Sequence, residues 1–503
     1  MFSITTEIGN KTIEITIFDN PYLQNERVKI FGFPLVEKSI DLNSFNFSKQ
    51  AKGVWAKIEL KNEEVKITTD ILGGYRLYYK QENDSIIITD KYKYLIENSQ
   101  KLSINENEYF FWKKHSYTSG GFTFLKNIKK INPASSLTIT KNQIIEDSYF
   151  NDIFREKDIT KHSQKIDDDL EDTFLKIKKI PKKKVLFFSG GKDSCLLANY
   201  LIKNEIDFSA IYLHFESDNV EDELKKVKLT SKKIGFKIKI IKIKKNEIDK
   251  KLENKILKKQ LFDRHVSKIQ YYGCKIIQKK YGNDVLLING QSSDSILSFG
   301  PSENTLMSYF RRKIMYFPES IISKIGLLLL MIKEKTRFYL PKNETEKLYA
   351  LFDDYKYTRV IKSNLDKEYH QYFQDYLSEK TKDLHSYHSK EMLCKILSFC
   401  QGSDNQVVIN SAKHFNLKVI MPFATPKIIY STIKFKDDYL ESKKPKYVVD
   451  KILDNKFNFE IKSNFELGFL NSIIFNSKNI VDNNYLKKYE KYVTRIILQK
   501  DDK

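Results

Sequence analysis

The stretch "LFFSGGKDSCLL", residues 186–197, places two glycines, two serines, a lysine and an aspartate between an apolar run and a helix-like segment. Glycines let backbone N–H groups approach an anion closely, and the start of a helix adds the positive end of its dipole. In an open parallel sheet, ligands bind at the carboxyl ends of the strands, where such turns lie. The predicted anion-binding residues of this turn are Ser189, Gly190, Gly191, Lys192, Asp193 and Ser194.

Asp193 indicates a metal as well as an anion. A carboxylate among phosphate-binding groups repels the ligand unless a cation lies between them, and Mg²⁺ suits one or two carboxylates together with phosphate oxygens. A second turn of similar composition, "LLINGQSSDSIL" (286–297), contains Gly290 and Asp294. Asp193 and Asp294 are therefore the predicted metal ligands. For either stretch, an ordinary turn without a ligand is the alternative.

The surrounding sequence alternates between strand-like and helix-like segments. The strand candidates are residues 183–189, 207–215, 236–243 and 284–290, and helical patterns cover 193–204 and 220–235. Such alternation predicts a doubly wound parallel sheet. Residues 300–503 read mostly as helices and loops.

The first 150 residues have a different pattern, with short alternating apolar runs separated by turn residues. The clearest runs are 11–18, 53–60, 64–70, 85–90 and 135–140, with helical patterns near 92–98 and 104–114. This part is predicted to be a β-rich domain, and the charged, helix-like residues 151–180 to form a bridge.

The bulk composition excludes several classes of protein. The chain has 503 residues, 41% of them hydrophobic, and its longest apolar run, "IGLLLLMI" (325–332), is too short to span a bilayer. The first residues lack the pattern of a secretory signal, so we expect a cytoplasmic protein with no membrane partner. Four cysteines without a CxxC pair indicate neither a disulfide framework nor a zinc site.

The net charge of +22 raises the question of a nucleic-acid partner. Lysine dominates over arginine, and lysine is the poorer bidentate reader of phosphate. Basic residues are spread along the chain, with only local runs such as residues 176–184. The sequence therefore does not favour nucleic acid, although it leaves that partner open.

The motif "SGGKDS" resembles the pyrophosphate loop of the N-type ATP pyrophosphatases, and it lacks the Walker A pattern. The resemblance implies that ATP and Mg²⁺ are the cofactors and that AMP, rather than a phosphoryl group, is transferred. Further segments occur in the order found in asparagine synthetases: residues 218–236, 290–295, 404–433, 444–453 and 460–469. The last of these places Lys462 on the catalytic lysine of that family. The resemblance implies a catalytic set of Lys462, Asp294 and Gln291, with Gly290 among the nucleotide-binding residues.

The β-rich domain resembles the glutaminase domain of the same family. The matching segments are "DILGGYRLYY" (70–79) and "GGFTFLKNIKKINPASSLTI" (120–139). That glutaminase uses a cysteine next to the initiator methionine, where this chain has Phe2 followed by Ser3, and no cysteine occurs before Cys195. The resemblance thus implies residues 1–155 as a degenerate, Ntn-type glutaminase-like sandwich. Residues 165–503 would form the adenylating synthetase domain, as in β-lactam synthetases and lasso-peptide cyclases.

The chain also departs from the asparagine synthetases at the synthetase site. Gln291 stands where the family has a glutamate, and a glutamine cannot act as a general base. Lys418 and Ile420 replace a glutamate and an arginine, and Lys192 replaces a hydrophobic residue. These departures put aspartate as the substrate in doubt.

The expected function is ATP-dependent amide formation without glutamine hydrolysis. The expected substrate is a small molecule or peptide that supplies a carboxylate and an amine. A tRNA-modifying adenylating enzyme and a non-catalytic partner subunit remain as alternatives. The sequence is compatible with a homo-oligomer or with a pathway partner protein.

Overall fold

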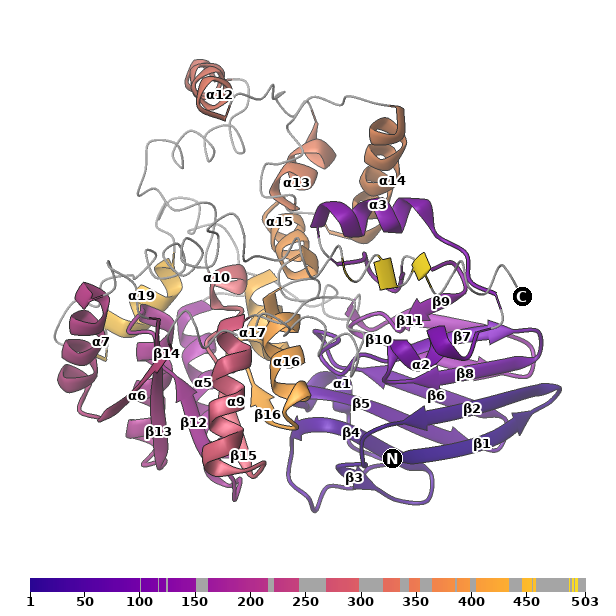
Figure 1. Ribbon diagram of the computed structural model, residues 1–503, viewed down its shortest axis with the longest axis horizontal. Coiled ribbons are helices and arrows are strands. Elements are labelled where there is room, and N and C mark those ends of the chain that lie inside the picture. Colours follow the sequence, from indigo (N-terminus) through magenta and orange to yellow (C-terminus); the bar gives the residue numbers. More distant parts are fainter. Residues whose placement is uncertain are drawn as a thin grey trace.

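The computed structural model describes most of the chain, and its parts are seen in Figure 1. The described residues are 1–99, 101–115, 117–123, 125–150, 162–215, 221–243, 268–297, 320–334, 343–352, 364–384, 387–398, 404–433, 446–454, 456–457, 488, 491–492 and 494–495. We refer to residues 1–150 as the β-rich part and to the elements around the parallel sheet as the parallel-sheet part.

Two sheets make up the described β-rich part. The first has the strand order β1-β2-β8-β7-β9 and the second β11-β10-β6-β5-β4-β3, and only β2 and β8 pair in parallel among the described pairs of these sheets. The strands are β1 (Phe2–Ile8), β2 (Lys11–Ile17), β3 (Leu23–Gln24), β4 (Val28–Leu35), β5 (Lys52–Lys61), β6 (Glu64–Thr69), β7 (Tyr78–Glu82), β8 (Ser85–Thr89), β9 (Ile128–Lys130), β10 (Ser135–Thr140) and β11 (Ile144–Ser148). The helices are α1 (Phe47–Gln50), α2 (Tyr92–Glu97) and α3 (Glu106–His115).

The two sheets share one apolar core. Alternation in β2 buries Ile13 and Ile15 of the first sheet, and Ile58 and Ile67 of the second sheet join the same cluster. Since successive side chains of a strand point to opposite faces, this pattern buries one face of each sheet. The first 150 residues are therefore β-rich as predicted, with two sheets around one core, and the likeness to a glutaminase domain stays a prediction.

A buried aspartate shapes the turn after β6. The carboxylate of Asp70 accepts hydrogen bonds from the backbone N–H groups of Trp55 (3.1 Å), Leu72 (2.9 Å), Gly74 (3.1 Å) and Tyr75 (3.1 Å). Burial nevertheless raises the pKa of this carboxyl above its ordinary value. The aspartate that begins the motif at residues 70–79 thus organises a turn.

The parallel-sheet part contains five described strands, all parallel, in the order β14-β13-β12-β15-β16. They are β12 (Lys183–Phe187), β13 (Phe208–Phe215), β14 (Ile238–Ile243), β15 (Val285–Ile288) and β16 (Lys418–Ile420). The helices are α5 (His162–Lys178), α6 (Lys192–Lys203), α7 (Glu221–Ile234), α9 (Lys268–Tyr281), α10 (Ser293–Ile296), α16 (Asp404–His414), α17 (Pro426–Ile433) and α19 (Tyr447–Asp454). One helical group consists of α5, α6, α17 and α19, and α9 packs separately against α16. The predicted parallel sheet is confirmed.

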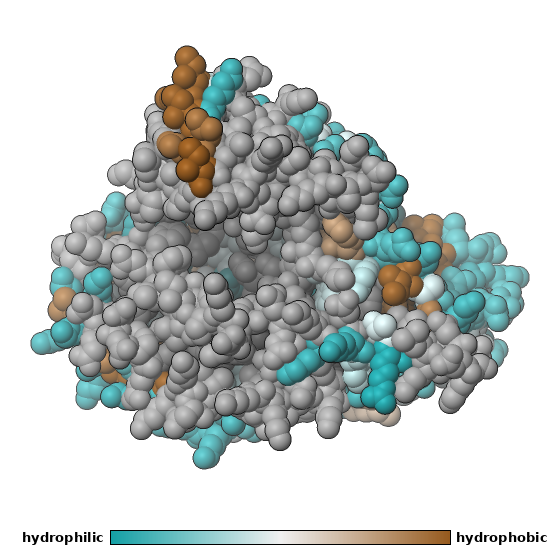
Figure 2. Space-filling model, turned by 45° about the horizontal axis from the view of Figure 1, so that its top comes forward, coloured by the Kyte–Doolittle hydropathy of each residue, from teal (hydrophilic) through white to brown (hydrophobic). Residues whose placement is uncertain are grey.

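The remaining described helices lie at the top of Figure 1: α12 (Ile321–Glu334), α13 (Glu344–Phe352), α14 (Asn364–Thr381) and α15 (Tyr387–Lys395). An apolar stripe on α12 is exposed, with Ile321, Ile325, Leu328 and Ile332 each more than half accessible. Figure 2 shows it as the brown group at the top of that view. Within the described residues, no helix is long and apolar enough to cross a membrane.

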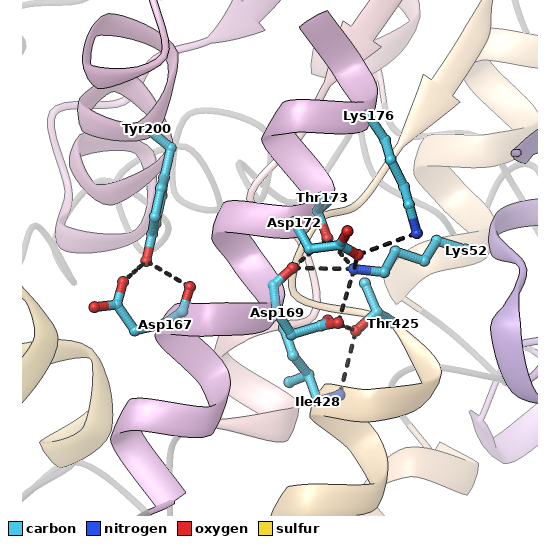
Figure 3. A network of polar contacts seen from close by, with 9 residues as sticks. All are labelled: Lys52, Asp167, Asp169, Asp172, Thr173, Lys176, Tyr200, Thr425 and Ile428. Carbon is cyan, nitrogen blue, oxygen red and sulfur yellow. Dashed lines mark hydrogen bonds and ion pairs between the residues drawn. The ribbon is translucent and has the colours of Figure 1, made fainter. Parts of the chain in front are cut away.

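A buried polar network joins the two parts through α5 (Figure 3). The ammonium group of Lys52, on β5, lies 2.7 Å from Asp169 Oδ1, 2.7 Å from Thr173 Oγ1 and 2.8 Å from Asp172 Oδ2. The hydroxyl of Thr425, directly before α17, donates to Asp169 Oδ2. One lysine of the β-rich part is therefore held by α5, which in turn holds α17.

Candidate functional site

The strand order changes direction between β12 and β15, and we refer to the two turns that follow these strands as the candidate site. The chain leaves β12 toward β13 and β14 on one side, and β15 leads to β16 on the other. At such a switch point the connections at the carboxyl ends of neighbouring strands diverge, and this is where open α/β sheets bind ligands. Both glycine turns singled out in the sequence follow these two strands.

The first turn connects β12 to α6. Gly190 has φ +75°, a left-handed conformation that favours glycine, and Gly191 caps the helix without a side-chain hydrogen bond. The backbone N–H of Gly191 donates to Ser189 Oγ at 3.3 Å, and Ser194 Oγ donates to the Gly191 carbonyl at 3.0 Å. The two serine hydroxyls lie 3.2 Å apart. They shape the turn, and the backbone at the start of α6 presents the positive end of the helix.

The second turn connects β15 to α10. The side chain of Asn289 accepts a hydrogen bond from the Gln291 N–H at 2.8 Å. Ser292 has φ +79°, and its hydroxyl donates to Asn405 Oδ1 at 2.5 Å. A Cβ atom added at Gly290 would lie 3.5 Å from Asp193 Cβ, so the two turns touch there. The fold thus brings together segments nearly 100 residues apart in sequence.

Asp193 is the point at which three segments meet. Its Oδ1 accepts a hydrogen bond from Ser293 Oγ at 2.8 Å, and its Oδ2 lies 2.5 Å from Lys446 Nζ. Lys446 directly precedes α19 and is buried. A second ion pair crosses the first, because Lys192 Nζ lies 2.5 Å from Asp450 Oδ1 on α19. Two ion pairs therefore join the first turn of α6 to the first turn of α19 and the residue before it.

The structure describes the three predicted catalytic residues to different extents. Gln291 lies in the second turn, half-buried. The backbone of Asp294 lies in α10, beside Ser293, and its side chain is outside the described part. Lys462 lies outside the described residues. The pairing of Asp193 with Asp294 around a metal thus stays a prediction, as does the role of Lys462.

The sequence did not single out the two partners of Asp193 and Lys192, which are Lys446, directly before α19, and Asp450, on α19. Both residues belong to the segment 444–453, which resembles a lysine segment of the asparagine synthetases, but the resemblance itself indicates Lys462 as the catalytic lysine. The signal was therefore present in "KPKYVVDKIL". Only the fold shows which of its lysines reaches the first turn.

The side chains of Lys418 and Ile420, two positions at which the sequence differs from the asparagine synthetases, have structural contacts. Lys418 Nζ lies 3.6 Å from Asp19 Oδ2 of the β-rich part. Ile420 is buried, and its carbonyl accepts the Asn289 N–H at 3.1 Å. The first side chain joins the two parts and the second belongs to the core.

The described cysteines are buried, and the described His, Cys, Asp and Glu side chains form no cluster for a metal ion. Cys195, on α6, is buried, and burial together with the nearby charge of Asp193 raises the pKa of its thiol. Within the described residues, no group of three or more His, Cys, Asp or Glu side chains is placed to hold a metal ion.

In the β-rich part, the place of the expected nucleophile is filled by packing. Phe2 lies on β1 opposite Ile17, with its ring centroid 5.5 Å from that of Phe31. Ser3 Oγ lies 3.3 Å from Thr16 Oγ1. The Thr16 hydroxyl in turn donates to Glu14 Oε1 at 3.1 Å.

No protein-family model matches the sequence, and no curated protein matches it. Among solved structures, an NH3-dependent NAD synthetase from Campylobacter jejuni matches with 16% identity and a TM-score of 0.21, over 43% of this chain and 96% of that one. An NMN synthetase from Francisella tularensis matches with 16% identity and a TM-score of 0.20, over 46% and 98%. A predicted subunit of a tRNA methyltransferase from Methanocaldococcus jannaschii matches with 19% identity and a TM-score of 0.16, over 34% and 88%. At these values the likenesses assign neither family nor function, and the resemblance to asparagine synthetases stays a prediction.

Proposed function

We propose that this chain is an ATP-dependent, AMP- and pyrophosphate-forming amide synthetase. It would adenylate a substrate carboxylate and couple it to an amine, on a peptide or an amino-acid-derived molecule. The observation that carries the proposal is the ion pair between Asp193 and Lys446, whose charged atoms lie 2.5 Å apart. It lies in the first turn of α6, at the point where the strand order of the parallel sheet changes direction.

The donor set fits a magnesium-bound triphosphate. A carboxylate, a serine hydroxyl and the backbone of a glycine turn are oxygen-rich and anion-binding groups, which suit Mg²⁺ and phosphate. Asp193 and Asp294 would hold the ion. When bound, Mg²⁺ would supply charge neutralisation for the leaving pyrophosphate.

The chain's own residues would divide the remaining work. The backbone from Ser189 to Ser194 would bind the β and γ phosphates at the start of α6. Lys446, already buried beside Asp193, would donate to phosphate oxygens and stabilise the negative charge that develops on them. Gln291 would hydrogen-bond to the substrate, since an amide cannot take up a proton as a base. Lys462 keeps its proposed role, which is to stabilise negative charge that develops on phosphate and at the tetrahedral centre.

The test of this function is the exchange of labelled pyrophosphate into ATP, driven by a panel of amino acids and peptides. We expect exchange with a carboxylate-bearing substrate, and its loss in both Asp193→Asn and Asp294→Asn. A matched control is Asp284→Asn, at an exposed aspartate just before β15. Exchange driven by bulk tRNA alone would favour the tRNA-modifying alternative, and a chain that binds no ATP would favour the non-catalytic one.

Glutamine is not the proposed nitrogen donor, because residues 1–194 contain no cysteine. We therefore expect the purified chain to release no glutamate from glutamine, with or without ATP, in a coupled glutamate assay. Release above the enzyme-free blank would contradict this part of the proposal.

A further inference from the structure

Exposed apolar side chains are concentrated on helix α12. In the described part of the chain, five of the eleven large apolar residues that are exposed lie on this one helix. They are Ile321, Ile322, Ile325, Leu328 and Ile332. Figure 2 shows the brown helix standing at the surface. Single exposed apolar residues are ordinary, whereas a contiguous group of them marks an interaction surface.

Four of these residues, the apolar stripe already described, form a narrow line along one side of α12. Ile321, Ile325, Leu328 and Ile332 follow one another at intervals of four, three and four residues, and each is 51–75% exposed. At about 100° per residue, the four positions fall within roughly 60° of the helix circumference. Gly326 lies on another side of the helix and is buried. The stripe is therefore not the side on which α12 is covered.

The spacing of the stripe is that of a coiled-coil seam. Ile325 and Ile332 take the a positions of the heptad, and Ile321 and Leu328 take the d positions. A stripe confined to a and d is narrower than the apolar face with which a helix packs on a globular core. Isoleucine at a, with leucine at the central d position, favours two strands. The pattern thus fits another helix as the partner.

The polar side of α12 does not resemble that of a helix lying on a membrane. Such helices carry many lysine and arginine side chains opposite their apolar face. Among the side chains of α12 that the structure describes, Lys324 is the only charged one. A second helix is therefore favoured over a lipid surface.

The size of the exposed group matches the need of a pair. Its five residues expose on the order of 500 Å², within the roughly 300–600 Å² of the largest apolar patch on a typical monomer. Packing this group against an identical one would remove about 1,000 Å² from water, the size at which a specific interface is expected. A second copy of the chain supplies both the helix and the area.

We propose that α12 is a self-association surface, on which the stripe of one copy packs against the same stripe of a second copy. Since both copies contribute the same residues, the contact closes on itself as a dimer. The net charge of +22 on each copy opposes their approach, and salt screens this repulsion. The proposal goes beyond the amide synthetase and does not depend on it.

Sedimentation velocity of the full chain, between about 1 and 100 μM, tests the proposal. We expect a monomer–dimer equilibrium whose dissociation constant falls at least twofold when NaCl is raised from about 0.1 M to about 0.5 M. Ile325→Gln and Leu328→Gln should each raise that constant at least tenfold, because each places an amide in an apolar seam. The matched control is Leu229→Gln on α7, where the leucine is 55% exposed against 57% for Leu328. It should leave the constant unchanged.

A chain that stays monomeric over this range would overturn the proposal. A dimer that persists unchanged in Ile325→Gln and Leu328→Gln, or one that weakens as salt is raised, would do so as well. Co-sedimentation with vesicles of phosphatidylcholine and phosphatidylserine is measured in parallel, and a monomer that binds them through Ile325 and Leu328 would assign the stripe to a membrane instead. Circular dichroism of each variant shows that it is folded, and Leu328→Gln carries the test where Ile325→Gln does not fold.

Discussion

At the scale of single residues, the proposed binding of metal and nucleotide depends on which cation neutralises Asp193. Lys446 does so in the structure, through a contact of 2.5 Å between largely buried groups. A hydrogen bond between two charged groups is stronger than a neutral one. A divalent ion at Asp193 would compete with the lysine for the same oxygen atom, and a triphosphate would give the lysine a new partner.

This competition gives a prediction with two opposite signs for Lys446→Met. Without nucleotide, Mn²⁺ should bind tighter, because Asp193 loses its built-in cation. A non-hydrolysable ATP analogue should bind roughly 10- to 150-fold weaker, since a charged hydrogen bond of about 1.5–3 kcal/mol is lost. Electron paramagnetic resonance of Mn²⁺ and calorimetry of the analogue measure the two effects.

The matched control is Lys203→Met, an exposed lysine at the far end of α6 that pairs with Glu171. It should change neither affinity. A fall of both affinities in Lys446→Met would argue that the lysine only holds α19 in place.

A second residue-scale prediction concerns Glu108, buried on α3. Its carboxylate accepts hydrogen bonds from Tyr372 OH at 2.7 Å and the Ser119 N–H at 2.9 Å, yet burial raises its pKa. A carboxyl whose pKa is higher in the folded state contributes stability at low pH, and this is lost as the pH rises through the raised pKa. We therefore expect Glu108→Gln to gain in free energy of unfolding, relative to the natural protein, as the pH rises above the ordinary range of glutamate.

Urea unfolding of both proteins at several pH values measures that difference. Other buried carboxyls, such as Asp70, are present in both chains and cancel. Parallel stability curves would show that the hydrogen bonds of Tyr372 and Ser119 fully offset the burial of Glu108.

Some residues of the candidate site could be predicted from the sequence and others could not. The two glycine turns and Asp193 could be predicted because each lies beside a strand in the sequence itself. Lys446 could not be chosen over other lysines, because a chain with 87 basic residues offers many candidates and the selection is made by burial in the fold. Lys462 remains a prediction because it lies outside the described residues.

At the scale of elements, the second turn combines an unfavourable backbone with a favourable contact. Ser292 has φ +79° at the start of α10, where an L-residue carries a penalty of roughly 1–2 kcal/mol. Its hydroxyl donates to Asn405 Oδ1, which is completely buried at the start of α16. The contact fixes the turn from which Ser293 donates to Asp193 on α6.

The two contributions can be separated with two substitutions of Ser292. Ser292→Ala removes the hydrogen bond and keeps the backbone penalty, so we expect a loss of about 1–3 kcal/mol. Ser292→Gly also relieves the backbone and should be more stable than the alanine variant by about 1 kcal/mol. Urea unfolding of both variants compares them, and an alanine variant as stable as the glycine one would show that this φ carries no penalty.

Element prediction succeeded where the periodicity was regular. The alternation in residues 11–18 and 64–70 matches β2 and β6 because each strand buries one face. Strand β4, "VKIFGFPL", was not predicted from the sequence. It is buried almost throughout and includes a proline, so its sequence shows no alternation of polar and apolar residues. Strand β16 has three residues and is defined by its pairing with β15.

At the scale of the whole molecule, the parts are joined by a buried ion pair. Lys52 and Asp169 are both almost inaccessible, and removal of Lys52 leaves Asp169 as a buried carboxylate without its lysine partner. Sequence reasoning identified residues 151–180 as a charged bridge, and the described α5 carries those charges. It could not show that Lys52 is their partner, 117 residues away.

We expect Lys52→Met to lower the free energy of unfolding by about 3–5 kcal/mol. The double variant Lys52→Met/Asp169→Asn should recover part of the loss, because the unpaired charge is gone. Chemical denaturation measures both, with Lys61→Met at the exposed pair with Glu64 as a control expected within about 0.5 kcal/mol. A Lys52→Met variant as stable as that control would contradict the buried pair.

The pairing of β15 with β16 also has a consequence for synthesis on the ribosome. Strand β15 ends at Ile288, and its outer neighbour ends at Ile420, so the nascent chain must grow by 132 residues before that edge is covered. At about 5–20 residues per second this takes on the order of ten seconds, during which an apolar strand edge stays open to other chains. Asn289 receives its carbonyl partner from Ile420 only then. We therefore expect the second glycine turn to be among the last features to mature, and truncations before residue 420 to bind chaperones or aggregate.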